Sequence, residues 1–132
     1  MGAITPSKED YLEAIYDLSR DGKPVRSIDV ANLLQYSRAS ISRAIALLRT
    51  DGYINQERYG TITLTPAGME KAQAVRKRHD LLKYFLIHIV EVDETTAETD
   101  ACRMEHIVSA QTLERIEALS AEHMKRFHAE EE

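Results

Sequence analysis

The hydrophobic period of the chain changes twice, and this constrains the fold more than any other feature. Over roughly the first 50 residues, apolar side chains recur with the period of an α-helix. Between Tyr53 and Leu64 the period becomes two, which predicts two short strands with a turn near residues 58–60. After Thr65-Pro66 the helical period returns and continues toward the end of the chain. The predicted order is helices, one hairpin and helices again.

Three helices are predicted before the hairpin. The first starts at Pro6 and ends before Asp21-Gly22, where a turn is favoured. Ser27 is predicted to cap a short second helix, and Ser37 a third that runs to about Thr50. The predicted inner faces are Ile28, Ala31, Leu33 and Leu34 for the second helix, and Ile41, Ala44, Ile45 and Leu48 for the third. Three helices and a hairpin form a winged helix-turn-helix, although a small α+β domain without DNA contacts has the same order.

The charge distribution favours DNA binding by the third helix. The chain has a net charge of −5, but Tyr36–Thr50 contains arginines and no acidic residue. Arginine and small polar side chains at the start of such a helix can contact phosphates and base edges. The predicted DNA contacts are Ser37, Arg38, Ala39, Ser40, Ser42, Arg43 and, in the hairpin turn, Arg58.

The second half is predicted to be entirely helical. One long helix follows Thr65-Pro66 to about Val90, a fifth runs from Asp93-Glu94 to about Val108, and Ser109 caps a sixth. The fold class is therefore mainly α, with a winged helix-turn-helix in residues 1–70 and a helical domain in 71–132. The sixth helix has few partners within so short a chain, and we expect its apolar row to form a dimer interface. That row is Leu113, Ile116, Leu119 and Phe127.

A candidate metal site is present in the fifth helix. Cys102, Glu105 and His106 are spaced i, i+3 and i+4, which places three side chains on one helix face. Thiolate, carboxylate and imidazole together suit a borderline divalent metal such as Fe(II), Co(II), Ni(II) or Zn(II). Alternatively, Cys102 is a small core residue and Glu105-His106 a solvated face.

Other candidate ligands are ambiguous when taken alone. His79 lies in the apolar stripe of the long helix, where a histidine is usually a core residue, but it could share a site with His106. Asp10 and Glu13 are spaced i, i+3 on the first helix and form either an acidic edge or part of an oxygen-rich metal shell. The remaining three histidines are interpreted as structural or solvated: His88, His123 and His128.

The rest of the composition indicates an intracellular protein. Its single cysteine cannot form an internal disulfide, which fits a reducing cytoplasm. The sequence has no apolar run of the roughly 20 residues that span a bilayer, and no secretory signal is visible.

Several segments, taken in order, resemble the diphtheria toxin repressor and manganese transport regulator family of metal-dependent repressors. The match is carried by Glu9-Asp10-Tyr11-Leu12-Glu13-Ala14-Ile15-Tyr16, Asp51-Gly52-Tyr53, Leu64-Thr65-Pro66-Ala67-Gly68, Arg78-His79-Asp80-Leu81-Leu82 and Ala101-Cys102-Arg103-Met104-Glu105-His106. The resemblance implies a cytoplasmic homodimer with a winged helix-turn-helix and a helical dimerisation domain. It also implies metal ligands at Asp10, Glu13, His79, Cys102, Glu105 and His106.

Individual residues resemble different branches of this family. Asp10 and Glu13 look like the manganese branch, whereas Cys102 looks like the iron branch. Lys83 and Glu98 stand where the iron branch has Glu and His, so its second metal site is not expected, and neither is its third, SH3-like domain.

The predicted function is a homodimeric repressor of metal-uptake genes that binds an operator in double-stranded DNA when activated by Fe(II) or Mn(II). No enzymatic activity, membrane contact or small organic substrate is expected. Two alternatives are a winged-helix regulator that senses oxidants or a small ligand through Cys102, and a metal-dependent hydrolase with Glu105 as base.

Overall fold

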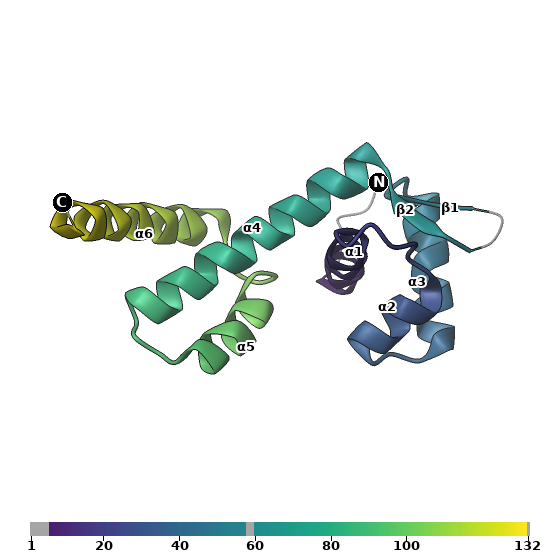
Figure 1. The fold of residues 1–132 in the computed structure, drawn as a ribbon, viewed down its shortest axis with the longest axis horizontal. Helices are drawn as coiled ribbons and strands as arrows, with labels where there is room; N and C mark the ends of the chain where they lie inside the picture. The colour runs from purple at the N-terminus through teal and green to yellow at the C-terminus, as the bar shows by residue number, and fades with distance from the viewer. Residues whose placement is uncertain (1–5, 58–59, 132) are drawn as a thin grey trace. The chain divides into compact units, whose positions relative to one another are not determined.

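A computed structural model describes residues 6–57 and 60–131 of the protein, with side chains described at 8–57 and 60–128. The chain divides into two units, Met1–Val75 and Arg76–Glu132. The division falls inside helix α4 (Pro66–His88), which therefore contributes residues to both units (Figure 1). Each unit has a hydrophobic core of its own.

The first unit has the predicted order of three helices and a hairpin (Figure 1). Its elements are α1 (Pro6–Ser19), α2 (Ser27–Leu34), α3 (Arg38–Thr50), β1 (Ile54–Gln56) and β2 (Ile62–Leu64). The strands pair antiparallel with Ile54 opposite Leu64. Asn55 is exposed between a buried Ile54 and a partly buried Gln56, so the hairpin covers the core with one face. This is a winged helix-turn-helix, as the sequence predicts.

The predicted inner face of α3 is confirmed, and that of α2 is confirmed at Ala31 and Leu34 but wrong at Ile28 and Leu33. All four predicted residues of α3 are buried: Ile41, Ala44, Ile45 and Leu48. In α2 the buried residues are Val30 and Ala31, whereas Ile28 is 40% exposed and Leu33 is 50% exposed. A helix of eight residues makes just over two turns, so its apolar positions define more than one stripe, and the packing of α1 and α3 selects between them.

The hairpin is fixed to the start of α4 by a compact junction. The Thr65 hydroxyl donates a 2.6 Å hydrogen bond to the carbonyl of Gly52, and the Thr65 N–H donates to the carbonyl of Tyr53 at 3.1 Å. At Gly68, an added Cβ would overlap the Tyr53 carbonyl oxygen, so only glycine allows this close approach. The junction holds the wing against the first turn of α4.

The second unit contains the rest of α4 together with α5 (Glu94–Met104) and α6 (Ala110–Glu131). Its buried core consists of Leu82, Leu86, Ala97, Ala101 and Ile116. The predicted end of the fifth helix at Val108 is wrong, because α5 stops at Met104. Ser109 accepts a hydrogen bond from the Thr112 N–H at 3.2 Å and so caps α6. Residues 105–107 form a turn instead, in which the N–H groups of His106 and Ile107 donate to the carbonyls of Arg103 and Met104, three residues earlier. No helix among the described residues is both long and apolar enough to cross a membrane.

Candidate metal centre and nucleic-acid interface

His79 is the centre of a polar cluster in the second unit. It projects from α4 and is only 1% exposed. Its Nδ1 lies 3.0 Å from Glu105 Oε2, and its Nε2 lies 2.9 Å from Glu98 Oε2. The hydrogen bond with Glu105 raises the pKa of His79 to about 9, against an opposing effect of burial and with further help from Glu98. Near neutral pH the metal-free protein therefore holds an imidazolium between two carboxylates.

Glu98 is a site residue that sequence reasoning did not select. It lies four residues before Cys102 on α5, so one helix face presents both side chains to His79. Burial raises the pKa of Glu98, but hydrogen bonds from His79 and Lys83 outweigh it and lower that pKa below its ordinary value. The Lys83 ammonium is 3.1 Å from Glu98 Oε2 and 3.6 Å from Glu94 Oε1. The i, i+4 spacing of Glu98 and Cys102 is the sequence feature that could have identified Glu98 as a candidate ligand.

Glu105 and His106 lie in the turn after α5 rather than within the helix. The Glu105 side chain is 2% exposed and is shared, with Oε2 facing His79 and Oε1 lying 3.3 Å from His106 Nε2. Cys102 Sγ lies 3.8 Å from His79 Nδ1. The expectation that Cys102, Glu105 and His106 converge along one continuous helix face is thus corrected, because Cys102 and Glu105 both lie next to His79 whereas His106 contacts Glu105.

The donor set of this cluster fits a divalent transition metal. His79, Glu98 and Cys102 each offer a ligand atom, and these atoms all lie within 4.8 Å of one another. Imidazole, carboxylate and thiolate all bind first-row divalent ions such as Fe(II) and Mn(II), although each ion prefers some of these ligands over others. A metal on one ring nitrogen of His79 would leave a carboxylate on the other nitrogen, which is the usual outer arrangement of a metal-bound histidine. Asp10 and Glu13 belong to α1 of the first unit, and their role stays a prediction from the sequence.

The start of α3 is an exposed surface on the first unit. Ser37 caps the helix by accepting a 3.2 Å hydrogen bond from the Ser40 N–H. The predicted contact residues of α3 and its cap are all exposed: Ser37, Arg38, Ala39, Ser40, Ser42 and Arg43. Arg58 lies outside the described residues. An exposed, basic start of α3 is the arrangement expected of a helix that recognises bases in the major groove of DNA.

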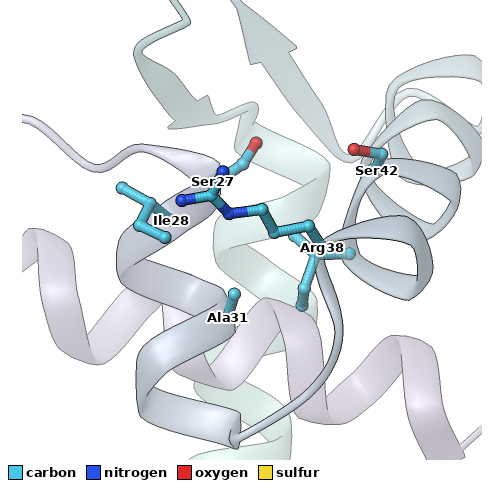
Figure 2. A pocket seen from close by; sticks show the side chains of 6 residues that line it. Ser27, Ile28, Ala31, Arg38 and Ser42 are labelled. Atoms are coloured by element: carbon cyan, nitrogen blue, oxygen red, sulfur yellow. The ribbon is translucent and has the colours of Figure 1, made fainter.

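A pocket of about 230 Å³ lies between α2 and α3. Figure 2 shows Arg38 reaching from the start of α3 toward Ser27 and Ile28 at the start of α2. The starts of two helices, a guanidinium and a serine hydroxyl are groups that bind a phosphate of the DNA backbone. This pocket therefore adds Ser27 to the surface that faces the nucleic acid in our interpretation.

A winged helix-turn-helix with an exposed basic helix, followed by a helical unit with a buried metal-type cluster, defines a metal-responsive transcription regulator. Residues 3–62 match the iron-dependent repressor N-terminal DNA-binding domain. Residues 65–131 match the iron-dependent repressor metal-binding and dimerisation domain. The chain belongs to the iron-dependent repressor family, whose members are metal-dependent transcriptional repressors.

Individual relatives agree with this assignment. The chain is 36% identical over 114 residues to an uncharacterised HTH-type transcriptional regulator of Methanocaldococcus jannaschii, covering 86% of this chain and 91% of that protein. It is 36% identical over 112 residues to the HTH-type transcriptional regulator MntR of Lysinibacillus sphaericus, covering 85% and 80% of the two chains. A manganese-dependent transcriptional repressor solved in complex with manganese superposes with a TM-score of 0.80 at 28% identity. That match covers 86% of this chain and 52% of the other, so the chain spans about half the length of the solved protein.

Proposed function

We propose that the protein is a homodimeric, metal-activated repressor that binds operator DNA and controls metal-uptake genes in the cytoplasm. The activating ion in this proposal is Fe(II) or Mn(II). The observation that carries the proposal is the buried His79 between Glu98 and Glu105, with Cys102 beside His79 and His106 beside Glu105. Membership of a repressor family favours this function over a hydrolase that uses Glu105 as base.

The residues would act as follows. His79, Cys102, Glu105 and His106 would hold the ion, and Glu98 would either bind it or orient His79. The ion would supply positive charge that offsets the clustered carboxylates. On the sequence match alone, we propose Asp10 and Glu13 as further oxygen ligands. An ion bound by both groups of residues would favour the arrangement in which the two reading helices of the dimer fit major grooves about 34 Å apart.

The test of this proposal is metal dependence of specific DNA binding. An operator is selected from random duplexes with the protein and Mn(II), and its affinity is then measured anaerobically with Mn(II), with Fe(II) and with chelator. We expect binding at least about 100-fold tighter with either metal, a ratio within the range of strong allosteric coupling. Equal affinity in chelator would reject metal activation.

Cys102 is predicted to set the preference between the two metals. Thiolate is soft, and Mn(II) binds most weakly in the first-row series, so sulfur favours iron more than manganese. Cys102→Glu should therefore shift the ratio of Fe(II) to Mn(II) activation toward manganese by about 10-fold, or about 1.4 kcal/mol. The measurement is operator affinity against free metal. Cys102→Ala is the control and should weaken both metals, whereas an unchanged ratio in Cys102→Glu would mean that the thiol only packs.

The raised pKa of His79 predicts a pH dependence for the metal-free protein. A histidine whose pKa is higher in the folded state stabilises the fold fully below its unfolded value, and this contribution disappears as the pH rises through the folded value. For His79 the window is pH 6.5 to about 9. In chelator, the free energy of unfolding should fall across this window by up to about 3 kcal/mol. Urea unfolding at several pH values measures it, and His79→Gln should show a flatter profile.

The proposed dimer interface is narrower than the sequence row suggested. Ile116 is buried in the core of its own unit and Leu113 packs against that core, because α4 and α5 cover this side of α6. Leu119 and Phe127 are 44% and 53% exposed, so they are the members available to a second copy of the chain.

Leu119→Glu should weaken dimerisation at least about 10-fold, because an unpaired carboxylate at an apolar contact costs on the order of 1–3 kcal/mol. Light scattering at micromolar concentration measures the oligomeric state. Lys125→Glu, an exposed change on the same helix, is the control and should remain dimeric. A monomeric wild type would contradict the proposed interface.

A further inference from the structure

A second cluster of metal-type side chains lies in the helical unit and is separate from the His79 cluster. A pocket of about 240 Å³ forms where the last turns of α4 approach the C-terminal half of α6. Three of the five histidines of the chain line it, and the other two, His79 and His106, belong to the first site. The lining residues are Tyr84, His88, His123, Met124, Phe127 and His128. The sequence interpretation of the three histidines as structural or solvated does not account for this convergence.

Two of these imidazoles are arranged as a pair. The ring centres of His88 and His123 are 5.7 Å apart. Two imidazoles that share one Zn(II) ion at about 2.0–2.1 Å have ring centres roughly 5–6 Å apart. The separation of this pair is therefore close to that of two imidazoles on one ion.

Tyr84 holds one member of the pair in place. Its hydroxyl and His123 Nδ1 are 2.8 Å apart, and its ring lies 4.3 Å from that of His88. A hydrogen bond at Nδ1 leaves Nε2 of His123 available, and a polar partner on the second nitrogen is typical of a metal-bound histidine. Among the described residues, neither His123 Nε2 nor either nitrogen of His88 has a hydrogen-bonding partner.

The chemistry of the lining distinguishes this pocket from the first site. Its donors are imidazole nitrogens and the Met124 thioether, and none of the residues that line it is a carboxylate. Mn(II) prefers oxygen ligands and binds most weakly in the first-row series, whereas imidazole suits the later ions. The pocket therefore disfavours Mn(II), one of the two ions proposed for the first site.

We propose that His88 and His123 form a second metal site that takes a late first-row divalent ion of the Zn(II), Ni(II) or Cu(II) group. Tyr84 is the positioning residue of this site. An ion held there would connect the end of α4 to α6, the helix that also carries the proposed dimer residue Phe127. The proposal does not depend on the function proposed for the His79 cluster.

The experiment is a Zn(II) titration of the full chain against a chromophoric chelator, with a parallel Mn(II) titration. We expect His88→Gln to lose one zinc equivalent per chain while Mn(II) binding stays unchanged. The fold should tolerate this change because the side chain is exposed, and circular dichroism checks it. Lys125→Gln, an exposed change on α6, is the matched control and should keep all zinc equivalents.

A second variant tests the role of the tyrosine. Tyr84→Phe keeps every proposed ligand but removes the hydrogen bond to His123, and we expect a 10–100-fold loss of zinc affinity. Co(II) in place of zinc should give a ligand-field spectrum that changes in His88→Gln and not in Lys125→Gln. The same zinc stoichiometry and affinity in wild type and His88→Gln would overturn the proposal, as would an equal loss of zinc in Lys125→Gln.

Discussion

Replacement of His79 by alanine should abolish metal-activated operator binding. His79 contacts both Glu98 and Glu105, and it lies 3.8 Å from Cys102, so its removal takes the common neighbour from the proposed centre. Loss of a residue that only orients a ligand typically reduces metal affinity 10–100-fold. Because His79 is a proposed ligand itself, its loss should reduce metal affinity at least about 100-fold. Operator affinity measured against free Mn(II) and free Fe(II) gives the size of the loss.

His88→Ala is the matched control for this variant. Both histidines project from α4, but His88 is exposed and lines the other pocket, so its replacement should leave Mn(II) activation unchanged. Metal-free His79→Ala should also keep its weak, non-specific affinity for DNA, because the first unit is unaltered. If His79→Ala were activated by Mn(II) as well as wild type, the cluster around His79 would not be the sensing site.

Arg43→Ala should weaken operator binding by about 1–3 kcal/mol without changing metal affinity. Arg43 is exposed and lies in the first half of α3, whose opposite face is buried at Ile41 and Ile45. A contact to a base would relax specificity at one operator position. A contact to a phosphate would instead weaken all sequences alike and reduce the salt dependence by about one charge. Binding curves for the operator and for single-base variants, at several salt concentrations, separate these cases.

Arg49→Ala provides a comparison within the same helix. Six residues after Arg43, it points about 240° further around α3, and its guanidinium lies 3.4 Å from Gln56 in the hairpin. We therefore expect a smaller effect on affinity and none on base preference. If Arg43→Ala left the affinity for every DNA unchanged, α3 would not read the operator.

The predictable parts of the fold are those that one segment determines by itself. The inner face of α3 was predicted because 13 residues repeat a single apolar stripe between a serine cap and Asp51-Gly52. The buried residues of α2 were only partly predicted, because Ile28 and Leu33 are as apolar as Val30 and packing against the neighbouring helices determines which of them is buried. The end of α5 was also missed, because the pattern is helical to Val108 whereas residues 105–107 form a turn with hydrogen bonds to residues three positions earlier.

The candidate site shows the same distinction. Cys102, Glu105 and His106 could be selected from local spacing, but the central position of His79 depends on how α4 packs against α5. Glu98 was noticed only as a departure from the iron branch, and its partners His79 and Lys83 come from a different helix. The histidine pair in the second pocket likewise joins α4 to α6 across 35 residues of sequence, from His88 to His123. Local patterns identify ligand types, whereas tertiary packing decides which of them meet.

The most direct test of metal activation is the effect of operator DNA on metal affinity. Linkage requires that, if metal tightens DNA binding by a given factor, DNA tightens metal binding by the same factor. Mn(II) affinity of the dimer is measured with and without saturating operator, and with a duplex of scrambled sequence. Metal activation through the His79 cluster predicts tighter Mn(II) binding with the operator, by the factor found in the reverse experiment, and no such gain in His79→Ala. The same Mn(II) affinity with and without the operator would contradict it.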